Sequence, residues 1–167
     1  MLLAVTALLV FGLDQGSKLL ILQNFEVGEI TPILGELLQF HVVKNSGAAF
    51  SLLSGSTWIF AVAASLVTIV IVVFARRIRS LAWAFVFGLL LGGTTGNLFD
   101  RFFREPGFGV GHVIDFLQIY LFPAIFNIAD VGITSAMALF IVLTLRGVGL
   151  DGSRTSRKPA AEPVDAA

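Results

Sequence analysis

The stretch "LAWAFVFGLLLGGTTGNLFDR", residues 81–101, is an apolar run of membrane-spanning length that ends in polar and charged residues. A helix needs roughly 20 apolar residues to cross the hydrocarbon of a bilayer, so the stretch predicts a span over 81–99. Gly88, Gly92 and Gly96 recur every four residues and therefore share one face of this helix. A stripe of small residues lets a second helix approach closely, so we expect a packed helical bundle.

The composition of the whole chain agrees with a membrane protein. Of its 167 residues 56% are hydrophobic and 13% are charged, and the mean hydropathy is +0.92. A soluble domain carries about 25% charged residues. Three more apolar stretches predict spans over 1–22, 57–74 and 129–145. The first lacks a basic leader and a small-residue cleavage pattern, so we expect a retained helix and not a cleaved signal peptide.

The basic residues predict the orientation in the membrane. Arg76, Arg77 and Arg79 crowd the short connection between the second and third spans, and the C-terminal tail is also basic. The positive-inside rule then places both termini in the cytoplasm and the segments 23–56 and 100–128 outside. The net charge is zero, which gives no argument for nucleic acid binding, and the absence of cysteine excludes disulfides and thiolate chemistry.

The outer segments predict a small amount of β-structure. Leu38, Phe40 and Val42 alternate with more polar neighbours, which is typical of a half-buried strand. The later outer segment begins as a loop and becomes apolar, with aromatic residues that we expect at the level of the lipid headgroups. These are Phe116, Tyr120, Phe122 and Phe126.

The predicted fold is therefore an all-α membrane protein of four transmembrane helices. A small extracytoplasmic β-sheet and an outer-surface loop or helix are expected over the functional site. Residues 1–147 form one membrane domain in this interpretation, and 148–167 form a disordered cytoplasmic tail that is rich in Pro and Ala.

Charged residues within the spans are costly and usually mark a pair, a pathway or a site. Asp14 and Lys18 lie four residues apart, on one helix face, and are expected to form an ion pair. Asn97 shares a face with Asp100 and Arg101 at the outer end of the third span. For both groups a structural network is favoured over direct catalysis.

Asp115 and Asp130 have no basic residue at helical spacing. If the two acids converge in a partly dry site, they cannot easily both ionise, and the pair shares a proton. Such a pair holds a base that activates water and an acid that protonates the leaving group. Spacing alone also allows each residue to cap a helix or to bind water at the membrane surface.

Several short stretches together resemble the lipoprotein signal peptidase, or signal peptidase II, family. They are "DQGSK" (14–18), "KNSGAAFS" (44–51), "GGTTGNLFDR" (92–101), and "HVIDF" (112–116) with "FNIAD" (126–130). The resemblance covers roughly residues 5–147. It implies an aspartic endopeptidase of the bacterial inner membrane, with its site on the extracytoplasmic side. Such an enzyme removes the signal peptide from diacylglyceryl-modified prolipoproteins by cutting before the lipidated cysteine.

The resemblance also implies residue roles and partners. Asp115 and Asp130 match the catalytic aspartates of the family. The family's supporting polar residues map to Asp14, Lys18, Asn45, Asn97, Asp100, Arg101 and Asn127, and Gly47 adjoins them. The expected partners are prolipoprotein signal peptides, membrane lipids and cyclic peptide antibiotics of the globomycin type, acting on a monomer.

Two supporting roles follow from the chemistry of the side chains. We expect Asn45 to donate to the developing oxyanion and Asn127 to orient a catalytic aspartate. No cofactor or metal is expected, because a lone histidine near an interface, as at His41 and His112, is usually a hydrogen-bonded surface residue.

Three alternatives remain at the level of sequence. A small transporter or proton-conducting protein would relay protons through charges spread across the membrane, such as Asp14, Lys18, Asp100 and Asp115. A serine peptidase would pair Ser46 or Ser51 with Lys44 or Lys18. A noncatalytic assembly protein would leave the paired acids unexplained.

Overall fold

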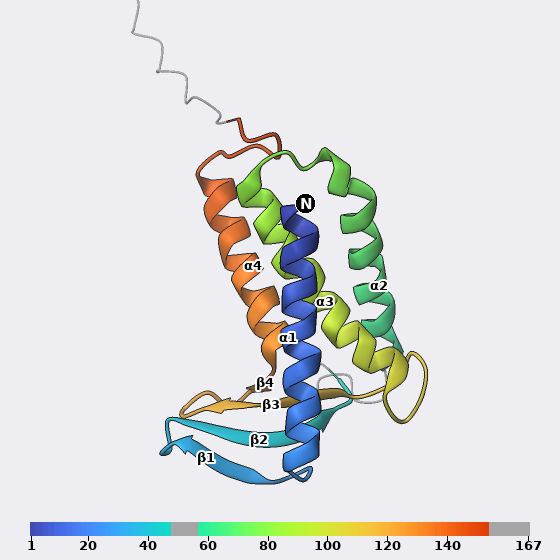
Figure 1. Ribbon diagram of the computed structural model, residues 1–167, viewed down its shortest axis with the longest axis vertical. Coiled ribbons are helices and arrows are strands. Elements are labelled where there is room, and N and C mark those ends of the chain that lie inside the picture. The colour runs from blue at the N-terminus through green and yellow to red at the C-terminus, as the bar shows by residue number, and fades with distance from the viewer. Residues whose placement is uncertain (48–56, 154–167) are drawn as a thin grey trace, which may run out of the picture.

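The computed structural model describes residues 1–47 and 57–153. Four helices run side by side and a small sheet lies across one end of them (Figure 1). The helices are α1 (Leu2–Asn24), α2 (Thr57–Phe74), α3 (Leu81–Phe103) and α4 (Ile128–Leu145), with a short 3-10 turn, η2 (Ala75–Arg77), after α2. All four helices are long and apolar enough to cross a membrane, as predicted, and α3 extends four residues beyond its predicted end.

The sheet is antiparallel and has the strand order β1-β2-β3-β4. Its strands are β1 (Ile30–Leu34), β2 (Leu38–Asn45), β3 (Val113–Ile119) and β4 (Ile125–Phe126). The alternating pattern correctly predicted β2. The sequence interpretation missed β3 and β4, although the run of Val and Ile in β3 is typical of strands. The expected loop or helix near the site is the loop at 120–124, between these two strands.

The sheet is fixed to the helices by a small apolar core. Ile21 of α1, Val42 of β2 and Phe116 of β3 are all buried and pack together. The expectation that Phe116 lies among headgroups is therefore wrong, because its ring is 3% exposed and faces this core. Tyr120 and Phe122, in contrast, are more than half exposed at the edge of the sheet. The core holds β3, and hence Asp115, against the outer end of α1.

The glycine stripe of α3 packs against α1, as predicted. A Cβ atom added at Gly92 would lie 2.6 Å from the carbonyl oxygen of Ala7, and one added at Gly88 would lie 2.6 Å from the Cβ atom of Thr6. These distances leave no room for a side chain. The hydroxyl of Thr95, beside this stripe, donates to carbonyl groups of its own helix, at Leu91 and Gly92.

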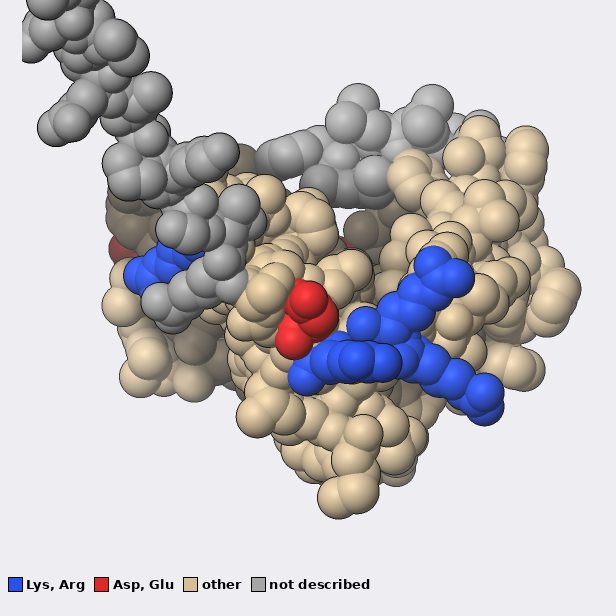
Figure 2. Space-filling model, turned by 90° about the horizontal axis from the view of Figure 1, so that it is seen from above, with Lys and Arg blue, Asp and Glu red and all other residues tan. Residues whose placement is uncertain are grey.

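Basic side chains gather at the end of the bundle opposite the sheet (Figure 2). Here the chain after α4 folds back: Trp83 Nε1 donates to the carbonyl of Val148 at 2.8 Å, and the carbonyl of Leu150 accepts from two backbone N–H groups before α3. The predicted start of a disordered tail at residue 148 is therefore too early. Residues 154–167 lie outside the described part of the chain.

The close approach of α1 and α3 predicts a stability effect. Gly92→Ala forces the new methyl group into the backbone of α1, and overpacking of this kind costs about 1–3 kcal/mol. We expect the midpoint of thermal unfolding in detergent to fall by several degrees. Gly12→Ala is the matched control, because a Cβ atom there meets nothing within 4 Å. Equal midpoints for the two variants would contradict the packing described above.

Candidate active site

Asp115 occupies a buried position on β3, opposite Val43 of β2. Two amide groups donate to its carboxylate: Asn45 Nδ2 lies 2.7 Å from Oδ2, and Asn127 Nδ2 lies 2.6 Å from Oδ1. The sheet register explains the first contact, because Asn45 lies two positions from Val43 on the same face of β2. Asn45 was expected to serve the substrate oxyanion, but in the structure one of its N–H groups is used by Asp115.

Asp130 lies in the first turn of α4, where it forms a capping box with Asn127. Its backbone N–H donates to Asn127 Oδ1 at 3.0 Å, and its Oδ2 accepts from the backbone N–H of Asn127 at 3.1 Å. Asn97 Nδ2 donates to the other carboxylate oxygen at 2.9 Å. Because Asn127 also donates to Asp115, this one fully buried asparagine contacts both acids.

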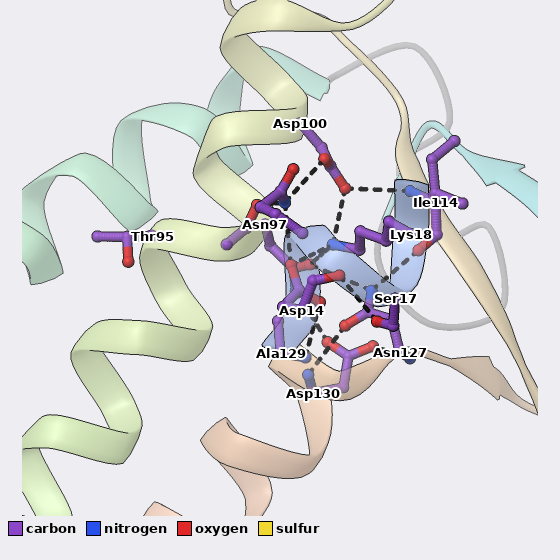
Figure 3. Close-up of polar contacts among 12 residues, drawn as sticks. Asp14, Ser17, Lys18, Thr95, Asn97, Asp100, Ile114, Asn127, Ala129 and Asp130 are labelled. Carbon is purple, nitrogen blue, oxygen red and sulfur yellow. Dashed lines mark hydrogen bonds and ion pairs between the residues drawn. The ribbon is translucent and has the colours of Figure 1, made fainter. Parts of the chain in front are cut away.

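Beside the two acids lies a buried ionic cluster formed by Asp14, Lys18 and Asp100 (Figure 3). Lys18 Nζ lies 2.8 Å from Asp14 Oδ2 and 2.7 Å from Asp100 Oδ2, and all three side chains are 0% exposed. The predicted pair of Asp14 and Lys18 is confirmed. Asp100 joins it from α3, a contact that spacing within one helix does not reveal.

The two carboxylates of this cluster hold the backbone beside each acid of the site. Asp14 Oδ1 accepts from the backbone N–H of Ala129 at 2.9 Å, and Asp100 Oδ2 accepts from that of Ile114 at 3.2 Å. Ala129 directly precedes Asp130, and Ile114 directly precedes Asp115. The first contact also satisfies an N–H group at the start of α4 that has no partner within the helix.

Lys18 further determines how the amide of Asn97 is oriented. An ammonium group only donates, so the oxygen of Asn97 must face Lys18, 3.1 Å away. The Nδ2 group of Asn97 then faces Asp130. Three acceptors, on Asp14, Asp100 and Asn97, match the three hydrogens of the ammonium group.

Two members of this network were missed by the sequence interpretation. Gln15 Nε2 donates to Asp14 Oδ2 at 3.0 Å and to Asp100 Oδ1 at 3.2 Å, and Arg104 Nε lies 2.6 Å from Asp100 Oδ1. Arg104 follows Asp100 by four residues, so helical spacing alone signals this pair. With Arg104 included, two acids and two cations give a neutral cluster.

Arg101 and Gly47 meet at the rim of the site. Arg101 Nη2 donates to the carbonyl of Gly47 at 2.9 Å, and its guanidinium lies 5.2 Å from the ring centre of Phe60. Its Nη1 group is buried and has no hydrogen-bond partner among residues 1–47 and 57–153. A buried donor without a partner is costly, so this nitrogen is suited to donate a hydrogen bond to a carbonyl oxygen of a ligand.

A cavity of about 710 Å³ opens onto both acids. The sequence-predicted residues Asn45, Gly47, Asn97, Arg101, Asp115 and Asp130 all line it. The rest of its wall includes apolar side chains from the loop at 120–124, from β4 and from α4. Four buried residues do not line the cavity but hold the residues of its wall through hydrogen bonds: Asp14, Lys18, Asp100 and Asn127.

The environment of Asp115 changes its acidity. The pKa of this carboxyl is raised to about 7, mainly by burial and also by the nearby charge of Asp130, while the hydrogen bonds from Asn45 and Asn127 oppose both effects. Asp115 therefore holds a proton below about pH 7 and loses it as the pH rises through that value. A protonated acid beside a second acid is the arrangement that water activation by paired carboxyls requires.

The structure disfavours the two alternative chemistries. Lys44 pairs with Glu105 at 3.0 Å on the exposed side of the sheet, and Lys18 is bound between two carboxylates, so neither is a free base for a serine. Ser51 lies outside the described residues. A proton relay is also disfavoured, because the charges of Asp14, Lys18 and Asp100 are sealed within one cluster and form no path across the bundle.

The chain is similar to known proteins over nearly its whole length. Residues 6–146 match a sequence family described as signal peptidase (SPase) II. The chain is 61% identical to a lipoprotein signal peptidase of Leifsonia xyli subsp. xyli, over 91% of this chain and 70% of that protein. It is 44% identical to a lipoprotein signal peptidase of Rhodococcus jostii, over 92% of this chain and 77% of that protein. A solved bacterial membrane enzyme has a TM-score of 0.77 at 29% identity, and the match covers 92% of this chain and 91% of that one.

The buried cluster predicts unequal roles for two lysines. Lys18→Met leaves two carboxylates buried without their cation, and breaking a buried pair in this way costs about 3–5 kcal/mol. We expect a large loss of thermal stability, or failure to fold. Lys44→Met is the matched control, because an exposed pair contributes less than about 1 kcal/mol. A Lys18→Met protein that unfolds at the wild-type temperature would show that the cluster is not a structural constraint.

Proposed function

The chain belongs to the signal peptidase II family of aspartic peptidases, and from this premise we propose that Asp115 and Asp130 are its catalytic pair. Members of this family process the signal peptides of prolipoproteins. The cut falls directly before the cysteine that carries the diacylglyceryl group. The observation that carries the proposal is that Asn127 hydrogen-bonds to both acids at the wall of one cavity.

The pair works with one proton between its two carboxyl groups. The ionised carboxyl takes a proton from water as the water oxygen attacks the carbonyl carbon of the scissile bond, and the protonated carboxyl donates to the carbonyl oxygen. The resulting diol collapses when the bond between carbon and nitrogen breaks. The nitrogen of the cysteine leaves as an amine after it accepts a proton from the pair.

The surroundings support this chemistry. Asn97 and Asn127 hold Asp130 with donated hydrogen bonds, which fix the position of its carboxylate. The unpartnered Nη1 group of Arg101 is placed to bind a carbonyl group of the substrate. Asn45 has a second N–H besides the one that Asp115 uses, which is available to the developing oxyanion.

The distribution of charge gives the orientation that we assign. The basic end of the bundle, with Arg76, Arg77 and Arg79, faces the cytoplasm together with both termini. The sheet and the catalytic pair then lie at the extracytoplasmic surface of the bacterial inner membrane, where water reaches them. We further propose that the protein acts as a monomer among membrane lipids and that cyclic peptide antibiotics of the globomycin type occupy the cavity.

The decisive experiment is cleavage of a diacylated lipobox peptide by purified protein in nanodiscs. Asp115→Asn and Asp130→Asn keep the shape of each side chain and remove its acid-base function, so each is expected to lower turnover by at least about a thousandfold. Asp151→Asn, at the opposite end of the bundle, is the control and retains full turnover. Near-normal turnover by either folded site variant would exclude that aspartate from catalysis.

The raised pKa of Asp115 predicts the alkaline limit of activity. The proton on this acid is present below about pH 7 and is lost as the pH rises through that value, so kcat is expected to fall above about pH 7. The hydrogen bond from Asn45 lowers this pKa, so Asn45→Ala is expected to move the alkaline limb of the profile to higher pH. Thermal unfolding across the same pH range separates this effect from loss of structure. If the alkaline limb of the kcat profile does not move in Asn45→Ala, the assignment of this limb to Asp115 is wrong.

A further inference from the structure

Two hydroxyl groups on α4 line the cavity and are not used by the site described above. Thr134 and Ser135 are both exposed, and both line the cavity. Some hydroxyl groups in the helices of this bundle donate to a carbonyl of the preceding turn, as Ser65 does to Ala61 and Thr95 does to Leu91. Neither the Thr134 hydroxyl nor the Ser135 hydroxyl makes a hydrogen bond to any residue within 1–47 or 57–153, although the backbone groups of both residues belong to the helix.

The two hydroxyls continue the polar wall from the catalytic pair into the membrane. Thr134 follows Asp130 by four residues, and Ser135 follows Val131 by four, so each lies one turn further along the helix on the same face. Asp130 and Val131 also line the cavity. With a rise of about 1.5 Å per residue, the hydroxyls lie roughly 6–8 Å beyond Asp130. Helix α4 runs away from the sheet, toward the basic end of the bundle (Figure 1).

A substrate that is cut in this cavity needs polar partners along that direction. The scissile bond must leave a helix before water can attack it, which frees backbone N–H and C=O groups of the preceding residues. In hydrocarbon each unpaired group costs several kcal/mol. The residues before the cut lie deeper in the membrane, because the signal peptide begins in the cytoplasm. An extended chain spans about 3.3 Å per residue, so the hydroxyls lie beside the second and third residues before the cut.

We propose that Thr134 and Ser135 form a backbone-binding track for the unwound end of the signal peptide. A hydroxyl both donates and accepts, so it pairs with an N–H or a C=O group whatever the side chain. The track therefore recognises an extended backbone and tolerates different sequences before the cut. This inference rests on the proposed function, since it concerns the same cavity and the same substrate.

The first test removes the hydroxyls without changing the shape of α4. Thr134→Val and Ser135→Ala are expected to lower kcat/KM for the diacylated lipobox peptide about 2- to 12-fold each, which corresponds to one neutral hydrogen bond. Thr144→Val is the matched control: Thr144 is an exposed threonine of the same helix that does not line the cavity. Thermal unfolding confirms that all three variants fold.

The second test asks whether the loss comes from the substrate backbone. Two further peptides carry an ester in place of the amide at the second or the third residue before the cut, which removes an N–H group and weakens the carbonyl acceptor. With at least one of these peptides, the loss of kcat/KM caused by the double variant Thr134→Val, Ser135→Ala is expected to be smaller than on the amide peptide, by about the factor that one hydrogen bond contributes. An equal loss on amide and ester peptides would mean a structural effect and would overturn the inference.

The controls separate this inference from the function on which it rests. If the wild-type protein does not cut the amide peptide, the proposed function fails, and the backbone track fails with it. If the wild type cuts but both hydroxyl variants match Thr144→Val, only the track is overturned, and the catalytic pair stands.

Discussion

The ammonium group of Lys18, held without solvent between Asp14 and Asp100, is the interaction on which the site depends. A buried charge is tolerated only when it is fully paired, so the three side chains fix one another. The carboxylates then hold the backbone N–H groups of Ala129 and Ile114. One cation thus determines where α4 begins and where β3 runs, and each of these elements contributes one of the two acids that we propose as the catalytic pair.

The same cluster also bears on the shared proton that we propose for Asp115 and Asp130. Lys18 and Arg104 neutralise the charges of Asp14 and Asp100 within the cluster. Among residues 1–47 and 57–153, the hydrogen-bond partners of the Asp115 carboxylate are the amides of Asn45 and Asn127, and neither partner is a cation. Burial and the charge of the second acid then outweigh these hydrogen bonds, and the pKa of Asp115 rises to about 7. The buried acids therefore differ in their direct partners: Asp14 and Asp100 each contact a cation, whereas Asp115 is hydrogen-bonded to two amides.

Local periodicity predicts only part of this arrangement. The spans, the glycine stripe and the pair of Asp14 with Lys18 follow from residue spacing within one helix. The contact of Asp100 with Lys18 joins two helices, so no spacing rule reveals it. The sequence interpretation placed Phe116 among the lipid headgroups because it lacked the tertiary contacts. An aromatic residue near the membrane surface is compatible both with the headgroup layer and with a protein core. The strand resolves the choice, since neighbouring residues alternate between faces: Asp115 lines the cavity and Phe116 enters the core.

Nearly all polar atoms in the hydrogen-bond network of the site have a partner, so a polar atom without one is informative. Lys18, Asn97 and Asn127 use their donors on one another and on the acids, so these residues hold the site rigid and have little left to offer a substrate. The Nη1 group of Arg101 remains unpartnered among the described residues, at the edge of the same cavity. In an apolar surrounding such a group is costly to maintain. We expect a peptide that enters the cavity to offset this cost by accepting a hydrogen bond from Nη1, which places a carbonyl group of the proposed substrate at this edge of the cavity.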